Sequence, residues 1–365
     1  MLIYLIVFFV SYKLLCVSQE NQNVRSQKAL VVMALLLPAI LAGLRDYSIG
    51  TDVQVYGNSW FYYARWNKAT TYFRMATSSD IGIVYAFVNY FTSLFTGSPH
   101  WFYFVLNMLT VSLIYKAAKD NADLGDVPFA MLTYYFLFYN QTLNMLRQSL
   151  AIAFVACAFT FIRKQKMWPF MVYAMLAVLS HMTAVVVFVM YMIYKVVNGK
   201  FGNLAKIGIL SGAAAVIVGF FPLMKILLQR GILPMRYMTY INNVSRGGGY
   251  VRLFLLCMPY LLLLLFFVKK DSYKKERNVL ICYLIISTLI SSLAFRMIYT
   301  VRIGYYFDVC LIFIIPFIAG NFRINVKVGG RAINKALLTT LMLGYWVFVY
   351  GIRQSGQTVP YLFMR

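Results

Sequence analysis

Apolar stretches of helical length follow one another along almost the whole chain. A helix needs about 20 apolar residues to cross the ~30 Å hydrocarbon core of a bilayer. Only helices and closed barrels satisfy their backbone groups in lipid, and these stretches are continuous instead of alternating, which disfavours a barrel. Twelve segments fit: 1–18, 28–44, 99–118, 127–140, 145–162, 167–181, 182–197, 207–221, 251–268, 278–295, 303–320 and 336–352. The pattern predicts an all-α polytopic membrane protein with about 12 transmembrane helices.

Composition supports this class. Of the 365 residues, 62% are hydrophobic and 12% are charged, against roughly 45–50% and ~25% in soluble domains. This excludes a soluble enzyme, a disordered tail and a disulfide scaffold. The five cysteines lie inside apolar runs without paired spacing, so we expect them to pack as small hydrophobes. Residues 1–18 lack a basic start and a cleavage site, which predicts a retained first span. No repeat or linker is visible, so residues 1–365 are treated as one domain.

Lysine and arginine in short loops predict the orientation of the spans, because cytoplasmic loops carry an excess of both. Four loops together hold 15 basic residues and are expected to face the cytoplasm: 163–166, 195–206, 269–277 and 321–335. The connections between them then face outward: Ser180–His181, 222–250 and 296–302.

Segment 81–96 decides the side of loop 45–80. We favour a re-entrant or interfacial helix at 81–96, which leaves loop 45–80 outside. If 81–96 crosses fully, loop 45–80 is cytoplasmic.

The two faces differ in the type of positive charge. Of the 15 inner basic residues 11 are Lys, whereas seven of the eight outer ones are Arg. The guanidinium fork binds carboxylate or phosphate oxygens in pairs, and the chain has only ten acidic residues. An anionic, phosphate-like ligand at the outer face is therefore expected; the alternative is contact with lipid phosphates. The net charge of +24 does not indicate nucleic acid, because the positive charge follows the membrane topology.

Three polar segments interrupt the apolar pattern and are candidate sites. The first follows a span and carries Arg45, Asp46, Thr51, Asp52 and Tyr56; its alternative is a capped helix start. The second is the polar run 140–148, which contains Arg147 and Gln148. Arg147 falls at a predicted helix start, where the dipole disfavours a cation unless an anion is present.

The third is His181, at the apex of the hairpin 167–197. About 15 residues per crossing reach only ~23 Å, so the apex is expected to be recessed. An intramembrane His indicates function and suits general-base catalysis; the alternative is a structural turn residue. Arg296 and Arg302 bracket a short connection with Tyr306 nearby; they are alternatively interfacial anchors. No metal-ligand cluster is visible, so no metal is expected.

These motifs resemble those of the EpsG family, which is similar to the Wzy polymerases of bacterial polysaccharides. The resemblance rests on Arg45-Asp46 with Gly50-Thr51-Asp52 and Tyr56, on 144–151 (NMLRQSLA), on Leu179-Ser180-His181, on Arg302 with 305–307 (YYF), and on Pro360-Tyr361. One departure concerns the acidic residue before the third hydrophobic segment, which here would be Asp80.

The resemblance implies a glycosyltransferase C-like fold and a metal-independent glycosyltransferase without cofactor. Such an enzyme joins undecaprenyl-diphosphate-linked oligosaccharide repeats into exopolysaccharide, O-antigen or capsule, at the outer face of the bacterial inner membrane. Its partners would be the lipid-linked donor, the bilayer, a chain-length regulator and a flippase. A lipid-linked oligosaccharide flippase and a polysaccharide ligase are the alternatives.

Joined to the residue analysis, the resemblance assigns roles to the site. The arginines Arg45, Arg147, Arg302 and Arg296 would bind the diphosphate. His181 or Asp52 would take the proton from the acceptor hydroxyl. Five further residues would support the site: Asp46, Thr51, Tyr56, Gln148 and Tyr306.

Overall fold

The computed structural model describes residues 1–231, 248–268, 274–293, 300–322 and 330–364. These residues form helices joined by loops. The extended pairing among them is limited to two isolated bridges, Arg45 with Phe363 and Val268 with Phe322. The prediction of an all-α polytopic membrane protein is therefore confirmed for this part of the chain.

The first half contains α1 (Leu2–Glu20), α2 (Val24–Gly43), α3 (Ser59–Trp66), α4 (Ala69–Ser78), α5 (Ile83–Phe95), α6 (Pro99–Asp120), α7 (Val127–Tyr134), α8 (Asn140–Asn144), α9 (Leu146–Arg163) and α10 (Met167–Ser180). The second half contains α11 (Val186–Asn198), α12 (Asn203–Gln229), α14 (Gly248–Arg252), α15 (Met258–Leu262), α16 (Lys274–Leu293), α17 (Thr300–Asp308), α18 (Leu311–Asn321) and α19 (Gly330–Trp346). Short π-helical or 3₁₀ segments extend or link several of them: Val53–Asn58, Tyr135–Tyr139, Met182–Val185, Leu253–Cys257, Leu263–Phe267, Val347–Ile352 and Ser355–Gln357.

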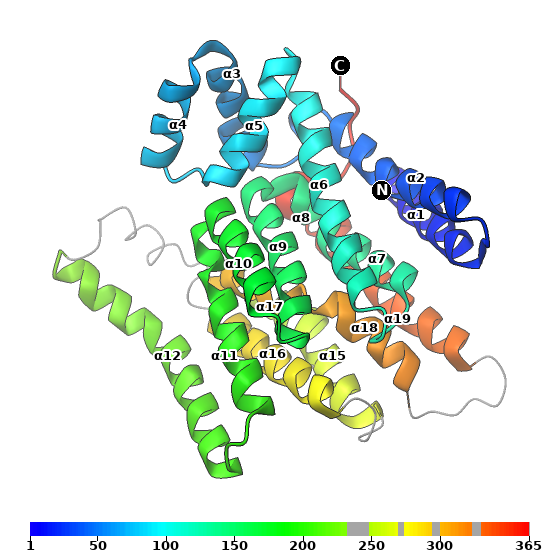
Figure 1. The fold of residues 1–365 in the computed structure, drawn as a ribbon, viewed down its shortest axis with the longest axis vertical. Coiled ribbons are helices and arrows are strands. Elements are labelled where there is room, and N and C mark those ends of the chain that lie inside the picture. Colours follow the sequence, from blue (N-terminus) through cyan, green and yellow to red (C-terminus); the bar gives the residue numbers. More distant parts are fainter. Residues whose placement is uncertain (232–247, 269–273, 294–299, 323–329, 365) are drawn as a thin grey trace.

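Helix α9 lies at the centre of the bundle and is the most buried of the candidate spans described. It packs against α6 and α10 (Figure 1). Four of its alanines have no exposed surface: Ala151, Ala153, Ala156 and Ala158. Small side chains let helix backbones approach closely, which is how helices in lipid gain packing energy. Because α9 begins directly after the polar run 140–144, this packing fixes the position of that run.

Seven described helices are long and apolar enough to cross a membrane, or eight if the bent pair α17–α18 is one span. Three shorter apolar helices have 13 to 17 residues, namely Ile83–Phe95, Met167–Ser180 and Met182–Asn198. The expected total of about 12 spans and the glycosyltransferase C-like fold stay predictions. The 13 residues of α5 reach about 20 Å at 1.5 Å per residue. That length favours a helix at 81–96 that does not cross fully.

Several spans are broken where polar residues lie inside the bundle. The π-helical segment Tyr135–Tyr139 leads into α8, and Met145 separates α8 from α9. Helices α17 and α18 meet at an angle of 44° directly after Asp308. Irregular backbone at membrane depth is tolerated where it is buried in protein or lines a cavity. The breaks therefore mark where polar chemistry is concentrated.

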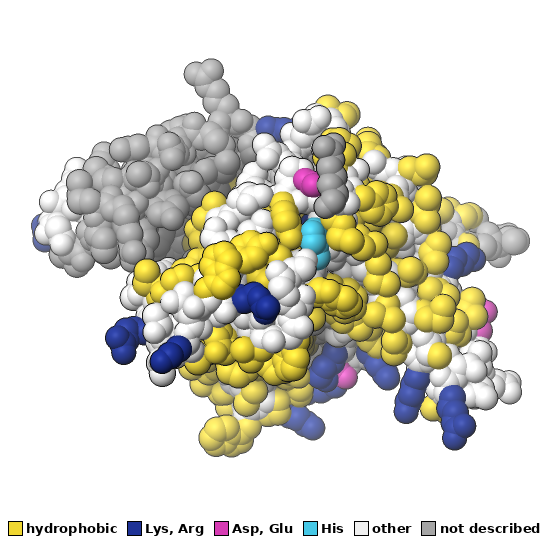
Figure 2. All heavy atoms as spheres, turned by 90° about the horizontal axis from the view of Figure 1, so that it is seen from above, with side chains coloured by type: hydrophobic (Ala, Val, Ile, Leu, Met, Phe, Trp, Pro, Cys, Tyr) yellow, Lys and Arg dark blue, Asp and Glu magenta, His cyan; other side chains and the backbone are white. Residues whose placement is uncertain are grey.

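Helices α3, α4 and α5 gather at the end of the molecule where the C-terminus also lies (Figure 1). Figure 2 shows hydrophobic side chains over much of this end, with several Lys and Arg side chains projecting at its edge. The C-terminal tail pairs with the loop after α2: Asp46 N donates to Leu362 O at 2.9 Å, and Met364 N donates to Leu44 O at 2.8 Å. The tail thus holds the first polar segment against the bundle.

Candidate functional site

The loop after α2 lies directly on the break between α8 and α9. Gly50 has a φ of +94°, and a Cβ there would overlap the Leu143 carbonyl. Only glycine adopts this conformation at low cost and permits such a close approach. Asn144 Oδ1 then accepts from the Thr51 hydroxyl at 2.8 Å and from Asp52 N at 3.2 Å. Residues from two segments about 90 positions apart are thereby fixed as one unit.

Arg147 occupies the first turn of α9, as the sequence predicted. Its guanidinium carbon lies 3.9 Å from the centre of the Tyr56 ring, and Nη1 donates to Asp80 O at 2.9 Å. Cation–π contact and this hydrogen bond hold the group flat and oriented. An arginine has five N–H donors, and the bond to Asp80 uses one of them. The side chain is half-buried, so the guanidinium remains within reach of a ligand.

The turn containing Asp80 joins Arg147 to the His181 hairpin. Asp80 and Gly82 have φ values of +56° and +87°. A Cβ on Gly82 would overlap the Ser180 carbonyl oxygen, so the turn packs directly on the residue before His181. Asp80, the acidic residue before the third hydrophobic segment, therefore lies beside the site, and its backbone oxygen accepts a hydrogen bond from Arg147.

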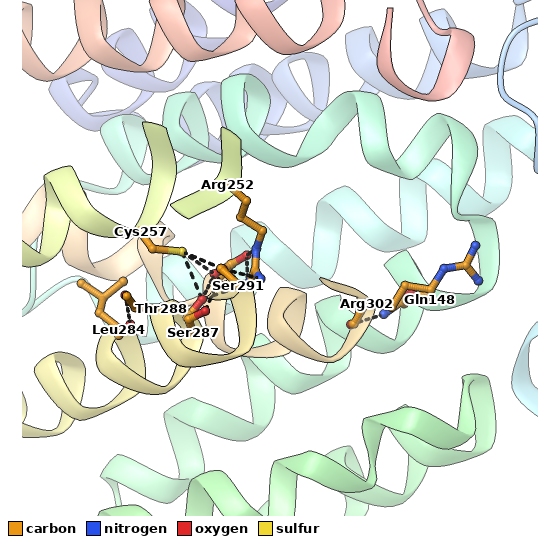
Figure 3. Close-up of polar contacts among 9 residues, drawn as sticks. Gln148, Arg252, Cys257, Leu284, Ser287, Thr288, Ser291 and Arg302 are labelled. Atoms are coloured by element: carbon orange, nitrogen blue, oxygen red, sulfur yellow. Dashed lines mark hydrogen bonds and ion pairs between the residues drawn. The ribbon is translucent and has the colours of Figure 1, made fainter. Parts of the chain in front are cut away.

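His181 belongs to a chain of polar contacts that reaches α17. Its Nδ1 lies 2.7 Å from Thr183 Oγ1, which is 3.0 Å from the Tyr306 hydroxyl. A second contact to α17 comes from α9, where Gln148 Nε2 donates to Arg302 O at 2.5 Å (Figure 3). His181 itself is half-buried in the connection between α10 and the 3₁₀ turn that precedes α11. The hairpin, α9 and α17 therefore meet at one place.

The charges of Arg147 and Arg302 affect the pKa values of both Asp52 and His181. Burial raises the pKa of Asp52 above its ordinary value, and Arg302 and Arg147 oppose that increase. Burial, followed by the charges of Arg147 and Arg302, lowers the pKa of His181 to about 4. Both groups are thus shifted toward their uncharged forms. Perturbed ionisation around a shared pair of arginines is typical of functional sites.

Two other predicted site residues lie away from an open ligand position. Arg45 is 1% exposed; its Nη1 donates to Leu143 O at 2.7 Å, and its guanidinium carbon lies 4.4 Å from the Tyr103 ring centre. Asp46 accepts from Ser48 N and Oγ at 2.9 and 2.7 Å, which closes its own turn. Arg296 lies outside the described residues.

A buried ionic cluster was missed by the residue analysis. Arg252 Nε donates to Asp308 Oδ2 at 2.7 Å, and its Nη atoms donate to Ser287 and Ser291 at 2.8 Å each (Figure 3). Arg252 is 4% exposed and Asp308 is fully buried. The signal was present in the sequence, because an arginine within an apolar span indicates function or an ion pair.

A cavity of about 280 Å³ lies beside the α8–α9 break. Asn144 and Met145 line it, together with Arg252, Tyr305 and residues of α19 and the C-terminal tail. The cavity was also missed, since its walls come from four separate parts of the chain. In the part of the chain that the structure describes, no three His, Cys, Asp or Glu side chains lie close enough to hold a metal ion.

Replacing Gly82 with alanine should disturb the site without unfolding the bundle. The new Cβ meets the Ser180 carbonyl in a left-handed conformation, which costs about 1–3 kcal/mol. We expect the turn to shift away from His181 and the activity of the protein to fall by at least about tenfold, measured as the ability of the variant gene to complement its own deletion. Gly344→Ala is the matched control, because no atom lies within 4 Å of a Cβ there. Equal activity in both variants would contradict the role of the turn.

Comparison with known proteins identifies the family. No curated protein and no solved structure gives a significant match. The model of the EpsG family matches residues 28–363, which include every polar segment described above. The resemblance seen in the sequence motifs is thus confirmed, and the chain belongs to the EpsG family.

Proposed function

We propose that this protein is a polysaccharide polymerase that joins oligosaccharide repeats carried on undecaprenyl diphosphate, at the outer face of the bacterial inner membrane. Membership of the EpsG family supports a polymerase role in general, and the apolar helices support a membrane protein. The observation that carries the finer proposal is the meeting of three segments: Arg147 contacts the Tyr56 ring and the Asp80 carbonyl, Gln148 donates to the Arg302 backbone, and His181 reaches Tyr306 through Thr183.

The two arginines would bind the diphosphate of the donor. Guanidinium groups pair with phosphate oxygens through parallel N–H bonds. As the bond between the anomeric carbon and the phosphate oxygen breaks, its electron pair leaves with the lipid diphosphate. Oriented donors that stabilise such developing charge supply a large share of catalysis. Tyr56 and the Asp80 carbonyl hold Arg147 in place for this task.

The acceptor hydroxyl oxygen would form the new bond to the anomeric carbon and give up its proton to a base. The ionisation of the two candidates favours Asp52: burial makes its carboxylate a stronger base, whereas it makes the His181 imidazole a weaker one. His181 would then orient the reacting groups through Thr183 and Tyr306.

Arg45 would act indirectly. Its buried guanidinium binds the Leu143 carbonyl next to Asn144, and Asn144 in turn holds Thr51 and Asp52. We therefore assign it a positioning role in place of the direct diphosphate contact expected from the sequence. Three other residues would have similar positioning roles. Asp46 and Thr51 would hold the loop after α2 through Ser48 and Asn144, and Gln148 would hold α17 through the Arg302 backbone.

Deletion of the gene tests the function. The deletion strain should accumulate single lipid-linked repeats on the outer leaflet, seen on gels after the intact membrane is labelled with a reagent that does not cross it and the lipids are then extracted. Single repeats confined to the inner leaflet would indicate a flippase. Normal polymer that fails only to reach its final acceptor would indicate a ligase.

The pH dependence of polymerisation identifies the base. Because the base must be unprotonated, the rate falls as pH drops through its pKa. With the raised pKa of Asp52, the acid limb lies above the ordinary value for aspartate. We expect this limb to persist in His181→Gln and to disappear in Asp52→Asn, whose rate drops by about 10²–10⁴. The opposite result would make His181 the base.

A further inference from the structure

We infer that the 280 Å³ cavity beside Asn144 binds a sugar residue of the acceptor glycan, separately from the diphosphate held by Arg147 and Arg302. This inference rests on the proposed function and adds a second subsite to it. Nothing in the family assignment specifies where an acceptor would lie.

The first argument is the chemistry of the lining. Three tyrosines, Tyr305, Tyr345 and Tyr350, contribute to the walls together with the amides of Gln141 and Asn144. Sugar rings offer apolar C–H faces and many hydroxyls, which suit tyrosine rings and side-chain amides respectively. Two arginines, Arg252 and Arg353, also line the cavity, and Arg252 is already paired with the buried Asp308; no Asp or Glu is among the described lining residues.

The second argument is an amide oxygen without a protein partner. Gln141 Oε1 is buried and accepts no hydrogen bond of normal geometry. A buried acceptor left unpaired costs about 1–3 kcal/mol, and Gln141 also lines the cavity, so turning its amide toward a ligand's hydroxyl would remove this cost. The neighbouring Asn140 differs: its side chain is satisfied by Thr358 and Trp346 and holds the wall in place.

The third argument is position. Asn144 both lines the cavity and holds the backbone of Asp52. Asn144 therefore connects the wall of the cavity to the segment that carries the proposed base. Arg147, in contrast, follows the Met145 break and contacts Tyr56 and Asp80, none of which lines the cavity. The diphosphate and the cavity ligand thus approach Asp52 from two different groups of residues.

The volume sets the size of the ligand. Small-molecule sites occupy about 300–1,000 Å³, so a cavity of about 280 Å³ suits roughly one sugar unit. The remainder of the repeat and its lipid would lie outside.

Blocking the cavity tests the inference. Ser355 is exposed and lines the cavity from the C-terminal tail, so Ser355→Trp fills it from its edge. Gln141→Leu removes the unpaired amide at nearly constant volume. It is the second test variant, and it keeps the test possible if the tryptophan variant misfolds. Ile352→Trp is the matched control, because Ile352 is 70% exposed and does not line the cavity.

The probe is the free oligosaccharide repeat, released by mild acid from the lipid-linked repeat of the source cells. Saturation-transfer NMR on the full chain in lipid nanodiscs reports its binding, and membranes supplied with lipid-linked repeats report polymerisation. We expect binding to weaken by at least about tenfold in Ser355→Trp and Gln141→Leu, which corresponds to about 1.4 kcal/mol. Polymerisation should fall in parallel, and Ile352→Trp should match the wild type.

The two readouts separate the two proposals. Equal binding in Ser355→Trp and wild type, or no binding to the wild type, overturns the acceptor cavity even if polymer is made. Binding that the cavity variants abolish, in a protein that makes no polymer, supports the cavity and overturns the polymerase instead.

Discussion

Replacing Arg147 with lysine is expected to reduce polymer synthesis by at least about tenfold, and Arg147→Gln by ~10²–10³, the effect of removing one donor to a developing anion. Lysine keeps the charge but loses the planar fork that pairs with two phosphate oxygens. It also loses the flat stacking on Tyr56, at 3.9 Å in the native protein. The measurement is the initial rate at which membranes convert lipid-linked repeats into polymer.

The control for this prediction is Arg74→Lys. Arg74 is exposed on α4, in the same loop region as Asp52, and has the same charge. Its variant should keep the wild-type rate. If Arg147→Lys also polymerises normally while its protein level is unchanged, Arg147 does not bind the diphosphate.

The second large effect is on stability. Asp308→Ala leaves Arg252 buried without its counter-ion, because Arg252 lies 2.6 Å from Asp308 and is 4% exposed. Breaking one partner of a buried pair costs about 3–5 kcal/mol. We expect a clearly lower unfolding temperature, measured by size-exclusion chromatography of detergent-solubilised protein after heating.

Two comparisons isolate the cause. Lys116→Ala breaks a half-exposed pair with Asp120, worth at most about 1 kcal/mol, and should leave the unfolding temperature nearly unchanged. The double variant Arg252→Met, Asp308→Leu removes both charges and should regain much of the lost stability. If Asp308→Ala unfolds at the wild-type temperature, the ion pair does not stabilise the bundle.

Several elements of the site could be predicted from the chain because their signals are local. An arginine at a helix start, a histidine between two short apolar segments and a polar run inside an apolar stretch all stand out over ten or fifteen residues. The structure places Arg147, His181 and Gln148 at such positions. The conformational need for Gly50 and Gly82 could not be seen, because it comes from contact with Leu143 and Ser180 about 90 to 100 residues away.

Arg45 shows that neighbouring residues in the sequence do not predict whether a side chain is exposed. Its neighbours in the sequence are polar, so the segment resembles an open anion-binding loop. In the folded protein the guanidinium is buried against Tyr103 and the Leu143 carbonyl, which only the packing of α6 and α8 reveals. Exposure depends on what other segments cover a residue, and local sequence carries little information about it.

Hydrophobic length and composition by themselves determined that this is a helical membrane protein, because lipid permits few other ways to satisfy a backbone. Its short motifs by themselves determined the family. The tertiary structure alone decided which polar groups meet: it joined Asn144 to Asp52, placed the Asp80 turn between Arg147 and His181, and formed a cavity between α8, α17 and α19. Those contacts arise from how the helices pack around α9, and packing is a property of the whole chain.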